Sequence, residues 1–257
     1  MLQISPIPAF QDNYFWLIEN DTETWVVDPG DATPVIKALQ KRGKKLSGIL
    51  ITHHHSDHIG GVGELYHPEL QVIGPKKSQF RLVNDPVSAG DIRQLCGAQF
   101  EVIEVPGHTL NHLAFFSRLE EQAPVLFCGD TLFAAGCGRL FEGTPEQMYQ
   151  SLAQLLALPD NTQVYCAHEY TEANLKFALS VEPGNKDIVQ RAKEVSLLRA
   201  QGIPSVPTSI QIEKATNPFL RTTSAEIISN IKTKMQSAGS ANQIEVFAQL
   251  RKMKDVF

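Results

Sequence analysis

Cysteines and long hydrophobic runs are both scarce in this chain of 257 residues. Its four cysteines form no Cys-x-x-Cys pair and are too few for a disulfide scaffold, so we expect reduced thiols in the core of a cytoplasmic protein. No apolar run approaches the roughly 18 residues of a membrane helix. No Lys or Arg precedes Lys37, so the N-terminus does not resemble a signal peptide. We therefore expect no membrane partner.

Several catalytic motifs are also missing. The chain has no Gly-x-Ser-x-Gly elbow, no Walker A loop and no Gly-x-Gly-x-x-Gly after a strand, which argues against a serine hydrolase and a bound nucleotide. The net charge of −5 argues against a nucleic-acid partner. Hydrophobic residues make up 42% and charged residues 20%, which are ordinary values for a globular protein.

Charge is distributed unevenly along the chain. Residues 1–170 hold 11 Lys and Arg against 20 Asp and Glu, whereas residues 171–257 hold 12 against 8. This asymmetry suggests two modules, of which the second faces something anionic. The alternative, that surface charge merely drifts along the chain, stays open on composition alone.

Short strands alternate with helices in the first part of the chain. Residues 25–28 and 46–51 are predicted strands, and between them we expect a helix with Thr33 as N-cap, Pro34 at its first position and an end at Gly43. Thr144 and Gln147 form a capping box that opens a helix to about Leu158. Further strands are predicted over 70–73, 100–105, 112–117, 124–128 and 162–166.

Strand signals fade after about residue 170. Capping boxes at Thr223-x-x-Glu226 and Ser240-x-x-Gln243 open two of the helices predicted there, and 202–220 is predicted irregular. The predicted helices cover 171–180, 186–200, 223–236 and 241–254. The pattern indicates an α/β (α+β) chain of two modules with a boundary near 165–175.

Four of the eight histidines fall within residues 53–58, directly after a predicted strand. Alternate residues of an extended segment point the same way, so His53 and His55 can converge on one metal, while Asp57 and His58 aim at a second point nearby. Imidazole and carboxylate ligands suit Zn, Fe or Mn. A chance cluster or a purification tag is the alternative, but a tag belongs at a terminus.

Three more candidate ligands each follow a predicted strand, namely His108, Asp130 and His168. Each is weak alone, because a loop histidine is commonly a surface residue and Gly-Asp is commonly a turn. Their recurrence at successive strand ends predicts a site for two metals. We expect no ligand role for the remaining histidines: His54, which points away from its neighbours, His67 at a helix end, and His112 as a partly buried hydrogen-bonding residue.

The ordered motif His53-x-His55-x-Asp57-His58, then His108, Asp130 and His168, resembles the metallo-β-lactamase superfamily. The resemblance implies an αββα sandwich with two metals at one edge of its sheets. Within the superfamily the chain is similar to the glyoxalase II, or hydroxyacylglutathione hydrolase, family over nearly its whole length. The further matching segments are 129–133, 135–139, 166–170, Asn217-Pro218-Phe219 and 251–255.

This resemblance implies a metal-binding catalytic domain over 1–168 and a smaller, all-helical, glutathione-binding domain over 169–257. It also implies two divalent ions, zinc by preference with iron or manganese as alternatives. The implied ligands are His53, His55 and His108 for the first ion, and Asp57, His58 and His168 for the second, with Asp130 bridging. Asp57 and Asp130 would be the catalytic residues, acting with a hydroxide that bridges the metals.

Glutathione would be bound by residues that match the family's basic and aromatic contacts: Arg139, Phe141, Tyr170, Arg251 and Lys254. Without the resemblance, Arg251 and Lys254 would be interpreted as a solvated helix end. The family often has Lys at the position of Arg139 and Tyr at that of Phe141. Loss of a hydroxyl at 141 predicts weaker glutathione binding by roughly 0.5–1.5 kcal/mol.

The implied reaction is hydrolysis of S-(2-hydroxyacyl)glutathione, such as S-D-lactoylglutathione, to glutathione and a 2-hydroxy acid such as D-lactate, the second step of methylglyoxal detoxification. The expected partner is this small-molecule thioester alone, and we expect a monomer. Alternatives on the same fold are a glutathione-persulfide dioxygenase, a lactonase and a β-lactamase. A nuclease is disfavoured because the metal-bearing half is acidic, and a non-catalytic metal-binding protein because every ligand type is present.

Overall fold

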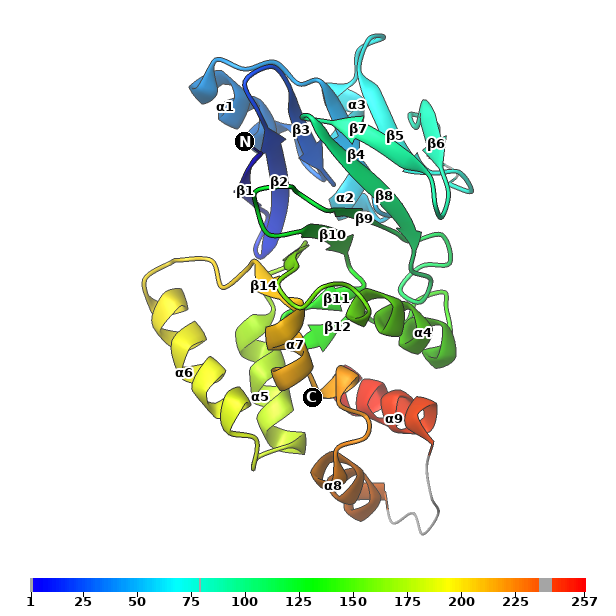
Figure 1. Ribbon diagram of the computed structural model, residues 1–257, viewed down its shortest axis with the longest axis vertical. Helices are drawn as coiled ribbons and strands as arrows, with labels where there is room; N and C mark the ends of the chain where they lie inside the picture. The colour runs from blue at the N-terminus through cyan, green and yellow to red at the C-terminus, as the bar shows by residue number, and fades with distance from the viewer. Residues whose placement is uncertain (1, 79, 236–241) are drawn as a thin grey trace. The chain divides into compact units, whose positions relative to one another are not determined.

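Strands dominate the first half of the chain in the computed structural model (Figure 1), which describes residues 2–78, 80–235 and 242–257. The helices of that half lie between residues 32 and 65, so the predicted alternation of strands and helices does not continue beyond them. The chain forms two compact units. Unit 1 comprises Met1–Pro106, Asn111–Gly129 and Tyr165–His168. Unit 2 comprises Gly107–Leu110, Asp130–Val164 and Glu169–Phe257. The division into domains at residue 168 remains a prediction.

The first sheet of unit 1 has the strand order β1-β2-β3-β4-β5-β6. Strands β1 to β3 pair antiparallel, and β3 to β6 pair parallel. The sequence predicts neither β1 nor β2, because Pro6 and Pro8 interrupt the strand pattern of β1, which lies at the sheet edge where proline is tolerated. The bounds are β1 Gln3–Ala9, β2 Asn13–Glu19, β3 Thr24–Val27, β4 Gly48–Leu50, β5 Gln71–Pro75 and β6 Asp85–Val87.

Helix α1 (Ala32–Arg42) connects β3 to β4 and packs its apolar face, including Val35 and Leu39, into the core beside the first sheet. The predicted N-cap Thr33 is wrong: the cap is Asp31, whose side chain accepts a hydrogen bond from the Thr33 backbone N–H at 2.8 Å. The predicted end at Gly43 is confirmed, with φ of 63°. Two short helices follow β4, α2 (Ser56–Ile59) and α3 (Val62–Leu65).

Most of the second sheet also belongs to unit 1, in the order β13-β10-β9-β8-β7. Its aromatic core includes Phe127, whose ring lies 6.1 Å from Phe100 and 5.2 Å from Tyr165. Four of these strands fall within a few residues of the predicted ranges, and β7 was not predicted. The bounds are β7 Ile92–Leu95, β8 Ala98–Glu104, β9 Leu113–Ser117, β10 Val125–Gly129 and β13 Gln163–Cys166. The fold class is the predicted mixed α/β sandwich.

Unit 2 is mainly helical (Figure 1). The hairpin β11–β12 precedes α4, and the helices α5 to α9 follow β13 with the short strand β14 and a 3₁₀ turn among them. Helix α6 has the predicted bounds. The elements are β11 Leu132–Phe133, β12 Gly136–Cys137, α4 Pro145–Leu156, α5 Thr171–Val181, α6 Lys186–Ala200, β14 Thr208–Ser209, α7 Ile210–Thr216, the 3₁₀ turn Pro218–Leu220, α8 Ala225–Met235 and α9 Gln243–Asp255.

Helix α7 lies in the segment that the sequence predicts to be irregular. Pro207 and Pro218 bracket it so closely that only seven residues are helical, too few for a clear periodicity. Ser209 caps it by accepting a hydrogen bond from the Ile212 N–H at 3.3 Å. The prediction of an irregular segment is therefore wrong over these residues.

Of the three capping boxes predicted from the sequence, one is confirmed, one has a different capping residue and one begins outside the described residues. The Thr144 box is confirmed in full. At α8 it is Ser224, not Thr223, whose hydroxyl accepts from the Ile227 N–H, and Glu226 accepts from the Gly184 N–H instead. Ser240 lies outside the described residues, and α9 carries its own box between Asn242 and Glu245.

Within the described ranges, no helix is long and apolar enough to cross a membrane. All four cysteine side chains are buried, as the sequence predicts for core packing.

Candidate metal centre and substrate pocket

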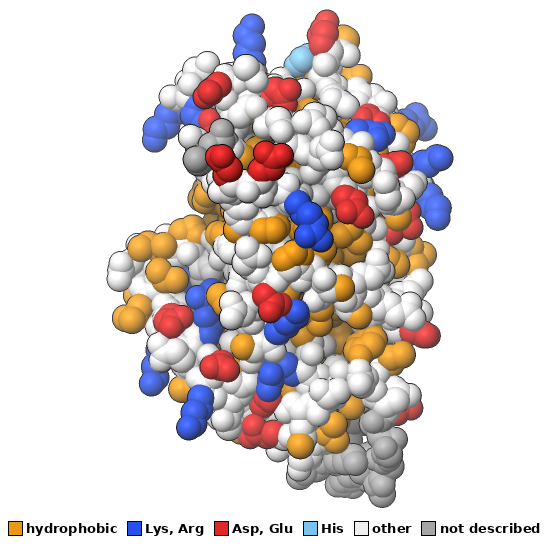
Figure 2. Space-filling view, viewed as in Figure 1, with side chains coloured by type: hydrophobic (Ala, Val, Ile, Leu, Met, Phe, Trp, Pro, Cys, Tyr) orange, Lys and Arg blue, Asp and Glu red, His pale blue; other side chains and the backbone are white. Residues whose placement is uncertain are grey.

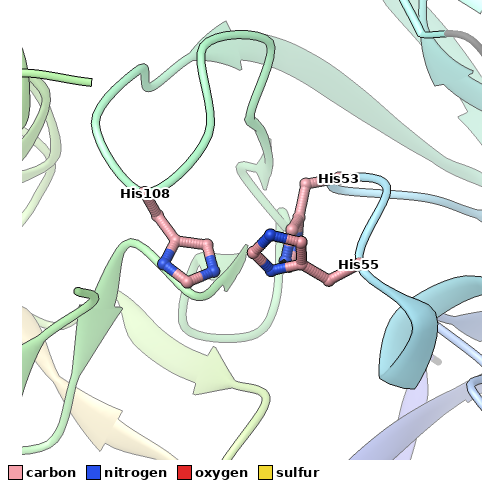
Figure 3. Close-up of side chains that lie close together, drawn as sticks. All are labelled: His53, His55 and His108. Carbon is pink, nitrogen blue, oxygen red and sulfur yellow. Dashed lines mark hydrogen bonds between the residues drawn. The ribbon is translucent and has the colours of Figure 1, made fainter. Parts of the chain in front are cut away.

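The histidine motif of unit 1 occupies the turn between β4 and α2. The imidazoles of His53 and His55 face each other, with His53 Nε2 3.1 Å from His55 Nδ1 (Figure 3). The turn packs so tightly that a Cβ at Gly30 would lie 1.9 Å from the Asp57 backbone oxygen, so only glycine fits there. The predicted convergence of these two alternate histidines is thus seen in the structure.

Asp57, His58 and His168 form a second group, whose ligand atoms lie within 4.8 Å of one another. Asp57 Oδ2 is 3.4 Å from Nε2 of each histidine and accepts a hydrogen bond from Asn13 Nδ2 at 3.0 Å. Burial by itself would raise the pKa of Asp57, but the two neighbouring histidines and the hydrogen bond from Asn13 hold this pKa well below the ordinary range. Asp57 is therefore an anion.

Each buried histidine of these groups has its Nδ1 occupied. His58 Nδ1 lies 3.0 Å from Asp28 Oδ2, and His168 Nδ1 lies 2.8 Å from Asp12 Oδ1. His53 Nδ1 lies 3.0 Å from the Thr52 hydroxyl. Such partners fix the tautomer and present Nε2 as the ligand atom, which is the usual arrangement around a protein-bound metal.

Asp28 organises two of these histidines at once. Besides contacting His58, its carboxylate accepts hydrogen bonds from the Thr52 N–H at 2.7 Å and the Thr52 hydroxyl at 2.6 Å, and Thr52 in turn contacts His53. Asp28 is buried and has a φ of 50°, a left-handed conformation that is uncommon outside glycine. Asp28 was not among the residues predicted from the sequence, although it follows a strand as the candidate ligands do.

His112 is fully buried, more deeply than predicted, and its ring stacks on that of His53 with centroids 4.5 Å apart. It therefore supports a candidate ligand. His67 is half-exposed beside Glu69, as expected of a residue without a site role.

The donor set of unit 1 fits a divalent metal. It combines imidazole nitrogens with an ionised carboxylate, holds them close together and backs them with buried hydrogen-bond partners. These ligands suit Zn, Fe and Mn alike.

Unit 2 carries the other two candidate ligands, side by side. His108 Nε2 lies 3.4 Å from Asp130 Oδ2, and His108 Nδ1 lies 2.8 Å from the Arg139 carbonyl oxygen. Both side chains are buried at one wall of a cavity of about 420 Å³. The cavity is lined by His108, Asp130, Phe133, Cys137, Arg139, Phe141, Tyr170, Asn174, Arg251 and Lys254.

Arg251 is the most deeply held cation of this cavity, with only 5% of its surface exposed. Its Nη1 donates to the Cys137 carbonyl oxygen at 2.8 Å, its Nη2 lies 3.1 Å from Asp255, and the guanidinium lies 5.0 Å from the centre of the Phe219 ring. A solvated helix end therefore does not describe Arg251. Arg251 also lines the cavity.

Lys254 and Arg139 add positive charge to the same cavity. Lys254 Nζ lies 5.7 Å from the centre of the Phe177 ring and 5.4 Å from that of Phe257. Burial, and then repulsion by the two arginines, lowers the pKa of Lys254. On the face of the molecule shown in Figure 2, Lys and Arg side chains are interspersed with Asp and Glu. The three cations Arg139, Arg251 and Lys254 all line the cavity.

Two aromatic residues complete the predicted substrate contacts. Phe141 is 64% exposed, and its ring lies 5.2 Å from that of His108. Tyr170 lies directly before α5, with its ring 5.2 Å from Phe133. The structure thus brings all five predicted substrate residues to one cavity. Their contact with glutathione stays a prediction.

Comparison with known proteins places this geometry in a family. Residues 169–257 match the model of the hydroxyacylglutathione hydrolase C-terminus, and residues 10–69 match that of the metallo-beta-lactamase superfamily. The structure of ETHE1 from Myxococcus xanthus, 23% identical, superimposes with a TM-score of 0.64 over 100% of this chain and 99% of that one, which shows a shared fold.

Relatives of much higher identity match along the full length. The hydroxyacylglutathione hydrolases of Aliivibrio fischeri and Methylobacillus flagellatus are each 50% identical to this chain over 260 residues, which cover 100% of both partners in each comparison. An identity of this size over complete chains shows common membership. The chain belongs to the hydroxyacylglutathione hydrolase family of the metallo-β-lactamase superfamily.

Proposed function

We propose that this protein is a binuclear metal thioesterase that hydrolyses S-(2-hydroxyacyl)glutathione, with S-D-lactoylglutathione as the substrate. One observation carries the proposal: His108 and Asp130, two candidate metal ligands, line the same cavity as the three cations Arg139, Arg251 and Lys254. A carboxylate-bearing substrate bound by the cations would have its reactive end at those ligands. Full-length identity to hydroxyacylglutathione hydrolases supports the same assignment.

The proposal assigns residues 1–168 to the metal-binding catalytic domain and 169–257 to the glutathione-binding domain. One divalent ion, zinc by preference, would be held by His53, His55 and His108. A second would be held by Asp57, His58 and His168, and Asp130 would bridge the two. Two such ions would make hydroxide available near neutral pH and polarise the thioester carbonyl.

The side chains of this protein would perform the remaining tasks. Asp57, held ionised by its neighbours, orients the attacking water by accepting a hydrogen bond from it. Arg251 offers a planar fork to a glutathione carboxylate, and Lys254 offers a point charge. The departing thiolate, with a pKa near ~8.5 for an ordinary thiol, needs no strong general acid. The protein would act as a cytoplasmic monomer on this small molecule alone.

A steady-state assay of the metal-loaded protein on S-D-lactoylglutathione, run beside S-D-lactoyl-N-acetylcysteamine, tests the proposal. We expect fast hydrolysis of the glutathione thioester and slow hydrolysis of the truncated one. Equal rates would retain the thioesterase and contradict the glutathione site. Absence of hydrolysis would overturn the proposal and favour a persulfide or a lactone as substrate.

A further inference from the structure

The hairpin β11–β12 forms a wall of the substrate cavity. Phe133 at the end of β11 and Cys137 in β12 both line the cavity, and the two residues between the strands make the turn. Ala135 in that turn has a φ of 55°, so a non-glycine residue is held in the left-handed conformation. Such a conformation persists only where the surroundings determine it.

Two side chains from the other end of the sequence hold this turn. Glu213 of α7 accepts a hydrogen bond from the Ala135 N–H at 2.8 Å. Asn217, just after α7, donates to the Gly136 carbonyl oxygen at 2.9 Å and lies 3.3 Å from that of Phe133. The turn is also held from α5, where Asn174 donates to the Ala134 carbonyl oxygen at 3.0 Å. The backbone polar groups of the turn are thus bonded to side chains.

Glu213 and Asn217 also support each other. Asn217 Nδ2 lies 2.9 Å from Glu213 Oε2, and the Thr208 hydroxyl donates to Glu213 Oε1 at 2.8 Å. Glu213 is 1% exposed and Asn217 is fully buried. A buried carboxyl destabilises a protein unless it is hydrogen-bonded. Here both oxygens of Glu213 have partners, and one of these partners is the backbone of the hairpin turn.

Movement of the hairpin would be transmitted to the binding groups of the cavity. The Cys137 carbonyl oxygen accepts the hydrogen bond from Arg251 Nη1, and the Phe133 ring packs against Tyr170. A hairpin that lost its support from α7 would therefore displace an arginine and a tyrosine together. His108 and its contact with Asp130 lie outside the hairpin.

We propose that Glu213 and Asn217 are positioning residues that set the shape of the glutathione-binding cavity, and so the KM for the thioester. The inference rests on the proposed function for the identity of the ligand. It assigns to Asn217-Pro218-Phe219, a segment that carries the family resemblance, a task at a pocket whose wall is formed some eighty residues earlier in the chain.

The test compares Glu213→Ala and Asn217→Ala with Glu213→Gln, and uses Gln211→Ala, at an exposed position of the same helix, as the matched control. KM and kcat for S-D-lactoylglutathione, glutathione affinity by calorimetry and metal content are measured for each. We expect the two alanine variants to raise KM and weaken glutathione binding about tenfold, with kcat within twofold and unchanged metal content. Glu213→Gln retains the wild-type KM, because its amide oxygen accepts from Ala135 and its amide nitrogen donates to Thr208.

A fall in kcat at constant KM and constant glutathione affinity would overturn the inference, because it would indicate only a smaller folded fraction. An unchanged KM in folded Glu213→Ala would overturn it as well. If the alanine variants do not fold, Thr208→Val decides, since it removes a single donor to Glu213: a two- to threefold weaker glutathione affinity supports the role, and no change contradicts it. Should the wild type bind glutathione without hydrolysing the thioester, the proposed function fails while calorimetry still tests the inference.

Discussion

The candidate metal ligands of unit 1 and the cavity of unit 2 are built in different ways. Four of the five ligands in unit 1 come from one stretch of six residues after β4, and buried hydrogen-bond partners orient their rings. The cavity draws its lining from residues as far apart as His108 and Lys254, and buried polar side chains hold its backbone. A local motif can thus define a metal centre, whereas a binding cavity depends on long-range support.

The largest effect is expected at Asp130, the carboxylate proposed to bridge the metals. Asp130→Ala should abolish thioester hydrolysis and lower the metal content, because both ions would lose a shared anionic ligand. Activity and metal per chain, by mass spectrometry, check this. Asp160→Ala, which removes a surface carboxylate of the same unit, is the control. Full activity of Asp130→Ala would disprove the bridging assignment.

The second-largest effect concerns the groups behind the ligands. Asp28→Asn should weaken metal binding by about ten- to a hundredfold, because an amide nitrogen would face the His58 Nδ1 and the Thr52 hydroxyl. Titration against a chromophoric chelator measures the affinity, with the exposed Asp21→Asn as control. Equal affinities of the wild type and Asp28→Asn would show that the ligands orient themselves.

These residues also mark how far the sequence could predict the site. The candidate ligands could be named from the sequence because they lie in segments that follow predicted strands, and because the order of the motif resembles that of a family. Asp28 and Asp12 were not predicted, because their histidine partners lie 30 and 156 positions away in the chain. Only the folded sheets bring such groups together.

The fold shows the same limit. Strands with regular apolar patterns were predicted within a few residues, whereas β1 was missed because its prolines are tolerated only at a sheet edge that the sequence does not reveal. In unit 2 the segment 202–220 gave no periodic signal, yet it contains α7 with Glu213. The residues that hold the cavity wall therefore lay where local patterns carry least information.

The carboxyl group of Glu213, which supports the cavity wall of unit 2, should make the stability of the protein depend on pH. Burial, against the opposing hydrogen bonds from Thr208, Asn217 and Ala135, raises the pKa of Glu213 to about 7. The folded protein therefore binds the Glu213 proton more tightly than the unfolded chain does. The resulting contribution to the free energy of unfolding is complete below the ordinary pKa of 4.5 and is lost as the pH rises through about 7. Between pH 5.5 and 8, the free energy of unfolding of the wild type should fall by roughly 2 kcal/mol because of this group. In Glu213→Gln this fall should be absent.

Urea denaturation of the metal-free protein at several pH values measures this difference. Glu172→Gln, at an exposed position in the first turn of α5, should leave the pH dependence of the wild type intact. Parallel pH profiles for the wild type and Glu213→Gln would contradict the raised pKa.

A smaller effect is expected at Arg251. Arg251→Lys keeps the charge but loses the fork that contacts the Cys137 carbonyl oxygen and faces the cavity. KM for S-D-lactoylglutathione should rise about tenfold, with kcat nearly unchanged, because binding is weakened far from the reacting carbonyl. Lys252→Arg, at an exposed position of the same helix, is the control. An unchanged KM would remove Arg251 from the substrate contacts.

The smallest effect concerns Phe141, at the exposed rim of the same cavity. Phe141→Tyr supplies the hydroxyl that the family resemblance leads us to expect at this position, so glutathione affinity should increase by the equivalent of roughly 0.5–1.5 kcal/mol, measured by calorimetry. The lower end of this range is expected, because 64% of the Phe141 surface is exposed and the new hydroxyl would exchange one water contact for one ligand contact. Phe10→Tyr, at a comparably exposed phenylalanine of unit 1, should change nothing. An affinity unaltered by Phe141→Tyr would mean that the rim acts through apolar contact alone, and that glutathione is recognised by the cations of the cavity, of which Arg251 is the buried one.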